Sequence, residues 1–188
     1  KSVTIASQRS TFSKSTMSSH DSMFARLYPY VGPQEIAAAV ASIAPGTPLR
    51  TPDDVRAWTQ DSRDDFDHAR RLIVTFVVDA DGVLRVADRR SEHVACAGGE
   101  PVLAAGEMTL RMSHAGVEAE EVSNQSTGYC PEPSSWPAVE QALSTAGIKG
   151  PDGYTRRFVF RRCGECDQIN LIKDGIYECD VCGAPLST

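Results

Sequence analysis

Residues 71–88 read RLIVTFVVDADGVLRVAD and decide the fold. Residues 72–78 (LIVTFVV) are apolar and rich in β-branched side chains, as in a central strand. The next four residues, Asp79-Ala-Asp-Gly82, have the composition of a tight hairpin turn. Residues 83–88 alternate between apolar and polar, which predicts a strand that returns antiparallel to the first.

Two further strands are predicted on the C-terminal side of this hairpin. Residues 101–112 (PVLAAGEMTLRM) follow Gly98-Gly99, and residues 117–124 (VEAEEVSN) follow a polar turn. Together with the hairpin they predict a four-strand antiparallel meander. A last strand is predicted over residues 154–162 (YTRRFVFRR).

Helices are predicted before and after the strands. Residues 33–44 begin at a proline and place Ile36, Ala39, Val40 and Ile43 on one face. Thr51 and Pro52 have the composition of a helix start, with Val55 and Trp58 facing inward. A third helix is predicted over residues 136–147, ending at a glycine.

The predicted fold class is α+β: N-terminal helices, an antiparallel β-meander, one further helix and strand, and a C-terminal zinc-ribbon hairpin. We divide the chain into a flexible Ser/Thr-rich arm (1–20), an α+β domain (21–160) and a zinc ribbon (161–188). Because the sequence begins with Lys1 rather than Met, we expect it to be cut from something longer.

The composition restricts the class of protein. The net charge of −6, from 25 acidic and 19 basic side chains, argues against a dedicated nucleic-acid binder. No apolar run approaches the roughly 20 residues that cross a bilayer, and the first residues lack the apolar core of a secretory signal. Four of the six cysteines form CxxC pairs, which favours metal ligation in a reducing compartment. We therefore expect a cytoplasmic protein without membrane contact.

The two CxxC pairs are Cys163-Gly-Glu-Cys166 and Cys179-Asp-Val-Cys182. Two residues between thiolates allow one tight turn to present both sulfurs to a single ion, and four thiolates form a closed tetrahedral zinc site. The spacer predicts a hairpin that turns at Asp174-Gly175. The pattern resembles a zinc ribbon over residues 161–186. We predict one structural zinc ion, with adjacent disulfides and a rubredoxin-like iron site as the alternatives left open.

Basic side chains cluster just before the first CxxC pair. Arg156, Arg157, Arg161 and Arg162 lie in pairs on either side of Phe158 and Phe160. A ribbon with such flanks can bind nucleic acid. A solvated strand face that balances an acidic protein is the interpretation we favour.

A second candidate site lies in the loops at 89–130. Tyr129, His93 and Glu107 form a potential acid–base set, with Cys130 as a nucleophile. Because Glu107 interrupts an apolar run, it must face solvent, occupy a pocket or pair with an arginine such as Arg89 or Arg90. Structural roles for each residue remain the alternative. The remaining candidates are small loop residues that allow close approach of a ligand or a strand bulge: Gly98, Gly99, Gly106, Ser126 and Gly128.

These loops also carry a resemblance. AGGEPVLAAG at 97–106, followed by STGYCP at 126–131, is similar to the C-terminal region of plant IQ-motif calmodulin-binding proteins and of related bacterial proteins of unassigned activity. The resemblance covers residues 92–148 and implies a helix after the second motif. It bears on fold more than on function. The IQ helix has no counterpart here, so calmodulin binding is not expected.

Three functions follow from these observations. We favour a zinc-stabilised cytoplasmic module that binds a protein partner or regulates it, because no complete nucleophile–base–orienter set can be assembled. The alternative is a small enzyme, or a toxin or effector catalytic domain, that uses the loops at 89–130. The second alternative is a zinc ribbon that binds nucleic acid.

Overall fold

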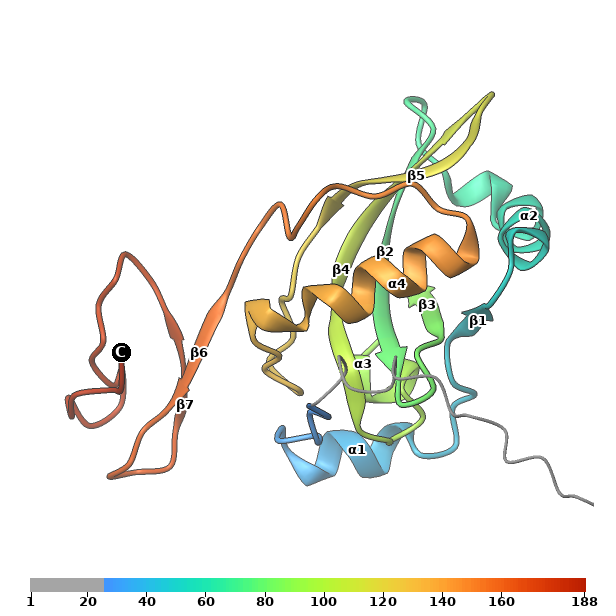
Figure 1. The fold of residues 1–188 in the computed structure, drawn as a ribbon. Coiled ribbons are helices and arrows are strands. Elements are labelled where there is room, and N and C mark those ends of the chain that lie inside the picture. Colours follow the sequence, from blue (N-terminus) through green and yellow to red (C-terminus); the bar gives the residue numbers. More distant parts are fainter. Residues whose placement is uncertain (1–25) are drawn as a thin grey trace, which may run out of the picture.

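The computed structural model describes residues 26–188 and has a mixed α+β architecture (Figure 1). The predicted fold class is confirmed, whereas the arm expected at residues 1–20 lies outside the described residues. No helix of the described part of the chain is long and apolar enough to cross a membrane. In chain order the elements are α1 (Gln34–Val40), β1 (Thr47–Leu49), α2 (Pro52–Asp61), η1 (Arg63–Asp65), β2 (Arg71–Asp79), β3 (Leu84–Asp88), α3 (His93–Cys96), β4 (Val102–Ser113), β5 (Gly116–Val122), η2 (Pro133–Ser135), α4 (Trp136–Ala146), β6 (Val159–Arg162) and β7 (Ile169–Ile172).

Five antiparallel strands form the large sheet, in the order β1-β3-β2-β4-β5. Phe76 of β2 pairs with Val86 on one side and with Gly106 on the other. A consecutive meander would place β4 beside β3. Instead the chain leaves β3 through α3 and returns on the other side of β2, which is buried on both faces from Val74 to Val78. β1 was not predicted, because it is three residues long and contains Pro48.

The sheet is covered on both faces. On one face, α2 and α4 pack against alternating side chains of the central strands, including Phe76, Leu84 and Leu110. Figure 1 shows α4 lying across the strands on this face. On the other face, Tyr28, Tyr129 and residues of α1 and α3 surround Val77, Val102 and Ala105.

The helix starts follow the sequence prediction closely. Thr51 accepts a hydrogen bond from the Asp54 amide, and the Asp54 carboxylate accepts one from the Thr51 amide, so both ends of a capping box are present. Val55 is buried and Trp58 packs against the core, as predicted. The first helix is shorter than predicted and ends at Val40. The predicted inward position of Ile43 is wrong, since this side chain is 54% exposed.

The last predicted strand is also too long. Tyr154 is buried against Trp136, with ring centroids 5.0 Å apart, and its hydroxyl lies 2.8 Å from Ser135 Oγ. Lys149 and Thr155 make backbone hydrogen bonds to the outer edge of β5. The chain then leaves the large sheet, and among residues 26–188 the partner of β6 is β7 alone, in a separate hairpin (Figure 1). The predicted domain boundary at residues 160–161 falls within β6, and the division into domains stays a prediction.

Candidate functional site: a four-cysteine metal centre

Two turns with the same hydrogen bonds hold the four cysteines. In the first, the Asp167 amide donates to the Cys163 carbonyl at 3.1 Å, and the Cys163 amide donates to the Gln168 carbonyl at 2.8 Å. In the second, Gly183 donates to the Cys179 carbonyl at 2.9 Å, and Cys179 donates to the Ala184 carbonyl at 2.8 Å. Asp167 and Gly183 occupy equivalent positions with φ of 63° and 71°. The left-handed conformation is tolerated by Asp and easy for Gly, which explains both residues.

The sulfur atoms of Cys163, Cys166, Cys179 and Cys182 all lie within 4.8 Å of one another. Two separations, Cys163–Cys182 and Cys166–Cys179, are 3.6 Å. A disulfide needs about 2.05 Å. Four thiolates about 2.3 Å from a tetrahedral zinc ion lie about 3.8 Å apart. The predicted ligand set is therefore assembled in one place, with the geometry of a single metal ion.

Amide groups surround these sulfurs and favour their ionisation. The Glu165 amide donates to Cys163 Sγ at 3.4 Å. The amides of Cys182 and Val181 lower the pKa of Cys179 to about 6. The Gln168 amide acts in the same direction on Cys166, but burial and the neighbouring thiols together raise the pKa of Cys166 to about 12. Neighbouring thiolates repel one another, and a cation between the four sulfurs would offset this repulsion.

Sequence reasoning missed the residue that supports the second CxxC pair. Asn170, 3% exposed, lies between apolar residues of β7. Its amide nitrogen donates to the Gln168 carbonyl at 3.0 Å and to Cys179 Sγ at 3.6 Å. Its oxygen accepts from the Asp180 amide at 3.0 Å. A buried Asn inside an apolar strand was the available signal, because such a side chain needs partners.

Each loop candidate has its own surroundings in the structure, and the acid–base hypothesis stays a prediction. His93 Nε2 donates to the Gly106 carbonyl at 3.0 Å, and burial lowers the pKa of His93 although Glu107 and Glu92 oppose this shift. Glu107 is half-buried on β4, opposite Thr75. Arg89 and Arg90 are exposed, and within residues 26–188 neither forms a salt bridge with Glu107. The expected arginine partner of Glu107 is thus not found among these residues.

Tyr129 and Cys130 also bond to backbone. The Tyr129 hydroxyl donates to the Glu100 carbonyl at 2.9 Å, and its ring packs edge-on against Tyr30. Cys130 Sγ donates to the Thr127 carbonyl at 3.2 Å, and burial raises the pKa of this thiol to about 11. In the described structure His93, Tyr129 and Cys130 each bond to a carbonyl rather than to one another.

The glycines of these loops have structural roles. Gly98 and Gly99, with φ of 67° and 84°, end α3, and their amides bond to carbonyls of that helix. A Cβ on Gly106 would lie 1.9 Å from the Ser123 carbonyl oxygen, and one on Gly128 would lie 2.7 Å from the Tyr30 ring. Ser126 is buried beside them, and its hydroxyl has no hydrogen-bond partner within residues 26–188.

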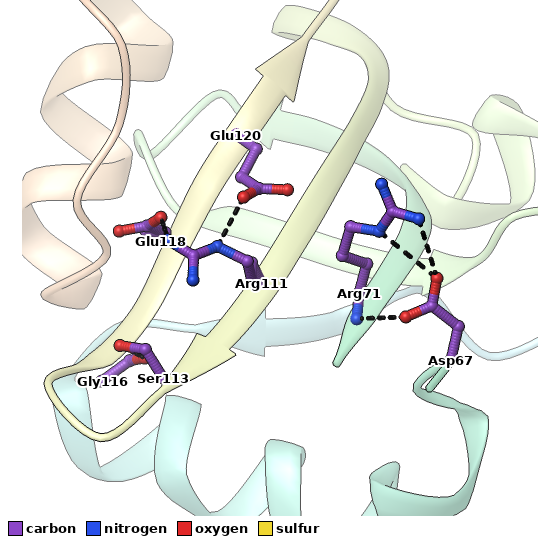
Figure 2. A network of polar contacts seen from close by, with 7 residues as sticks. All are labelled: Asp67, Arg71, Arg111, Ser113, Gly116, Glu118 and Glu120. Atoms are coloured by element: carbon purple, nitrogen blue, oxygen red, sulfur yellow. Dashed lines mark hydrogen bonds and ion pairs between the residues drawn. The ribbon is translucent and has the colours of Figure 1, made fainter. Parts of the chain in front are cut away.

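Charged side chains around the start of β2, the last part of β4 and β5 pair with one another. Figure 2 shows Arg111 between Glu118 and Glu120, and Arg71 bound to Asp67. The Glu118 carboxylate is the main reason that the pKa of Arg111 is raised. Asp67, Arg71 and Glu120 also line a hollow of about 440 Å³. The cluster is a paired, solvated sheet face.

A cleft runs between the C-terminal hairpin of β6 and β7, which carries the four cysteines, and the part of the chain that precedes it. Its two adjoining parts measure about 500 Å³ and 550 Å³ and share Val31, Phe160, Arg162 and Ile169. One wall comes from the hairpin, and the other comes from residues 26–33 and 127–132. The Val31 amide holds these two loops together by donating to the Gly128 carbonyl at 2.7 Å. Sequence reasoning missed this cleft, because its walls are distant along the chain.

A scan against models of known protein families finds no match, and no curated protein and no solved structure matches the chain. The comparisons therefore give no support to the resemblance of residues 92–148 to IQ-motif proteins. The cysteine cluster rests on the geometry of the chain itself.

Proposed function

We propose that this chain is a zinc-stabilised docking module that binds a protein partner at the cleft. One observation carries the proposal: the face of the hairpin that bears Phe160, Arg162, Ile169 and Leu171 forms a wall of the cleft. The four sulfurs lie at the end of the same hairpin. The metal thus fixes a binding wall on a segment too small to have a large core of its own.

Zinc fits the donor set. All four positions of a tetrahedral ion are filled by sulfur, which leaves none for water or substrate, so the ion has a structural role. Thiolate ligands need a reducing compartment, and a cytoplasmic location is part of the proposal. Iron, the other metal that takes four sulfurs, would be recognised directly by elemental analysis.

The loop geometry favours docking over catalysis. A general base must reach the proton that it removes, and a nucleophile needs a base beside it. His93 and Cys130 instead bond to the carbonyls of Gly106 and Thr127. We therefore assign these loops to packing, and Thr127 and Cys130 to the lining of the cleft.

Site-specific photo-crosslinking in the native cells tests the proposal. A photoreactive residue at Thr127, exposed on the cleft, should crosslink to a protein, whereas one at Glu140, exposed on α4, should not. The Thr127 crosslink should disappear in Cys179→Ser, because the hairpin wall then loses its metal. Crosslinks to nucleic acid, or equal protein crosslinking at both positions, would contradict the proposal.

A further inference from the structure

The cleft carries positive charge on both walls. Arg26 comes from the domain wall, and Arg161 and Arg162 come from β6. Arg161 donates to the Ser187 and Phe160 carbonyls, and within residues 26–188 it forms no salt bridge with a carboxylate. Its guanidinium retains donors for an incoming acid.

The other two arginines are weakly held. Arg26 pairs with Glu132 at 3.1 Å and Arg162 with Asp167 at 2.9 Å, both at exposed positions. Exposed pairs of this kind contribute about 0–1 kcal/mol. A ligand carboxylate therefore replaces the internal partner at little cost and forms a charge-assisted bond in its place.

The elongated cleft beside the edge of β6 favours an extended ligand. It spans two adjoining hollows, and three consecutive β6 residues, Phe160, Arg161 and Arg162, line one of them. Successive side chains of a strand point to opposite faces, so the cleft follows the edge of β6. In the described structure β6 pairs with β7 alone. An extended peptide beside such an edge gains backbone hydrogen bonds.

We infer that the cleft binds an extended peptide rich in Asp and Glu. This inference rests on the proposed docking function and specifies which kind of segment of the partner protein is bound. Apolar side chains of the peptide contact the half-buried Val31, Ile169 and Leu171, and its carboxylates bind the three arginines. Single-stranded nucleic acid is disfavoured because bases stack on exposed rings. The aromatic residues of the cleft offer little such surface, since Tyr129 is 2%, Tyr28 is 4% and Phe160 is 9% exposed.

Fluorescence anisotropy with the zinc-loaded chain tests this chemistry. The probes are a labelled decapeptide of alternating Glu and Val, the same peptide with Gln in place of Glu, and a single-stranded DNA decamer. We expect the Glu peptide to bind at least about tenfold more tightly than either other probe, with affinity that falls as salt is added. Equal binding of the Gln peptide, or tighter binding of the DNA, would overturn the inference.

Variants place the binding in the cleft. Arg161→Glu and Arg26→Glu, on opposite walls, should each weaken the Glu peptide by about tenfold or more. The matched control, Arg156→Glu with Arg157→Glu, changes exposed arginines of the same segment outside the cleft and should leave binding within about twofold. Metal content checks the hairpin in each variant. If Arg161→Glu loses metal, its weaker binding could come from a disordered hairpin. The result for Arg26→Glu, on the opposite wall, then decides whether the peptide binds in the cleft. Equal loss in the control pair would refute the assignment.

The two proposals fail separately. A Thr127 crosslink to a protein without binding of the Glu peptide would retain the docking function and reject the acidic ligand. Binding of the Glu peptide without a protein crosslink from Thr127 would support the chemistry of the cleft and reject the docking function.

Discussion

The carboxamide of Asn124 binds both backbone polar groups of Phe158. Its nitrogen donates to the Phe158 carbonyl at 2.8 Å, and its oxygen accepts from the Phe158 amide at 2.8 Å. The same nitrogen donates to the Pro131 carbonyl at 2.7 Å. One buried side chain thus joins the end of β5, the loop beside the cleft and the segment that enters β6.

Replacing Asn124 with Ala should destabilise the protein and loosen the hairpin. The substitution leaves two carbonyls and one amide without this partner, which costs about 2–4 kcal/mol in the free energy of unfolding. Chemical denaturation measures this cost, and hydrogen exchange should show faster exchange in β6 and β7. The neighbouring exposed Gln125→Ala should change stability by less than about 0.5 kcal/mol. A similar small effect for Asn124→Ala would contradict the role given to Asn124.

Metal removal should affect the hairpin selectively. Elemental analysis is expected to find one zinc ion per chain, and less in Cys179→Ser, whereas Cys130→Ser, outside the cluster, should retain it. Chelation should abolish hydrogen-exchange protection around residues 163–183, because the ion supplies much of the folding free energy there. Protection of β2 and β4 should persist. A metal-free preparation that is still fully protected in the hairpin would refute a structural ion.

His93 should make stability depend on pH. Burial lowers its pKa from the ordinary value of 6.5, so below pH 6.5 the unfolded chain binds a proton that the folded state resists. The free energy of unfolding should therefore fall as pH drops below 6.5, by at most about 1.4 kcal/mol per pH unit. The loss should level off once the pH is below the folded pKa.

Denaturation at pH 5.5 and 7.5 measures this dependence. His93→Gln keeps a donor for the Gly106 carbonyl and should reduce the difference between the two pH values, whereas the exposed His68→Gln should not. An unchanged difference in His93→Gln would show that another group is responsible.

The two cysteines outside the metal centre should be unreactive in the folded protein. Burial raises the pKa of Cys130 to about 11 and that of Cys96 to about 12, so little thiolate is present at pH 7.5. Alkylation of the zinc-loaded protein followed by mass spectrometry should leave both unmodified, and denaturation should expose all six cysteines. Rapid modification of Cys130 in the native state would revive its role as a nucleophile.

Local signals in the sequence predicted the central strands, the second helix and the clustering of the four cysteines. The run of β-branched residues at 72–78 and the turn at Asp79–Gly82 act through near neighbours, as do the Thr51 cap and the CxxC pairs. The hairpin turn at Asp174-Gly175 is present as predicted, with φ of 53° and 72°. Such features need no knowledge of the tertiary fold.

What the sequence did not predict depends on distant contacts. β4 lies beside β2 rather than β3 because the chain passes through α3 after β3. β1 forms only because β3 offers an edge to pair with. Tyr154 has the alternating pattern of a strand residue but is drawn into the core by Trp136. The acid–base hypothesis stays a prediction; in the described structure His93, Tyr129 and Cys130 each hydrogen-bond to a nearby carbonyl.

Both margins of the large sheet are closed to strand addition. At one margin β1 is three residues long and Pro48 lacks an amide hydrogen; at the other, Lys149 and Thr155 already bond to β5. Loss of the proposed zinc ion from the hairpin would therefore expose no long strand of this sheet to other molecules. Because templated fibril growth needs such a strand, we expect that metal loss does not turn the large sheet into a template for aggregation.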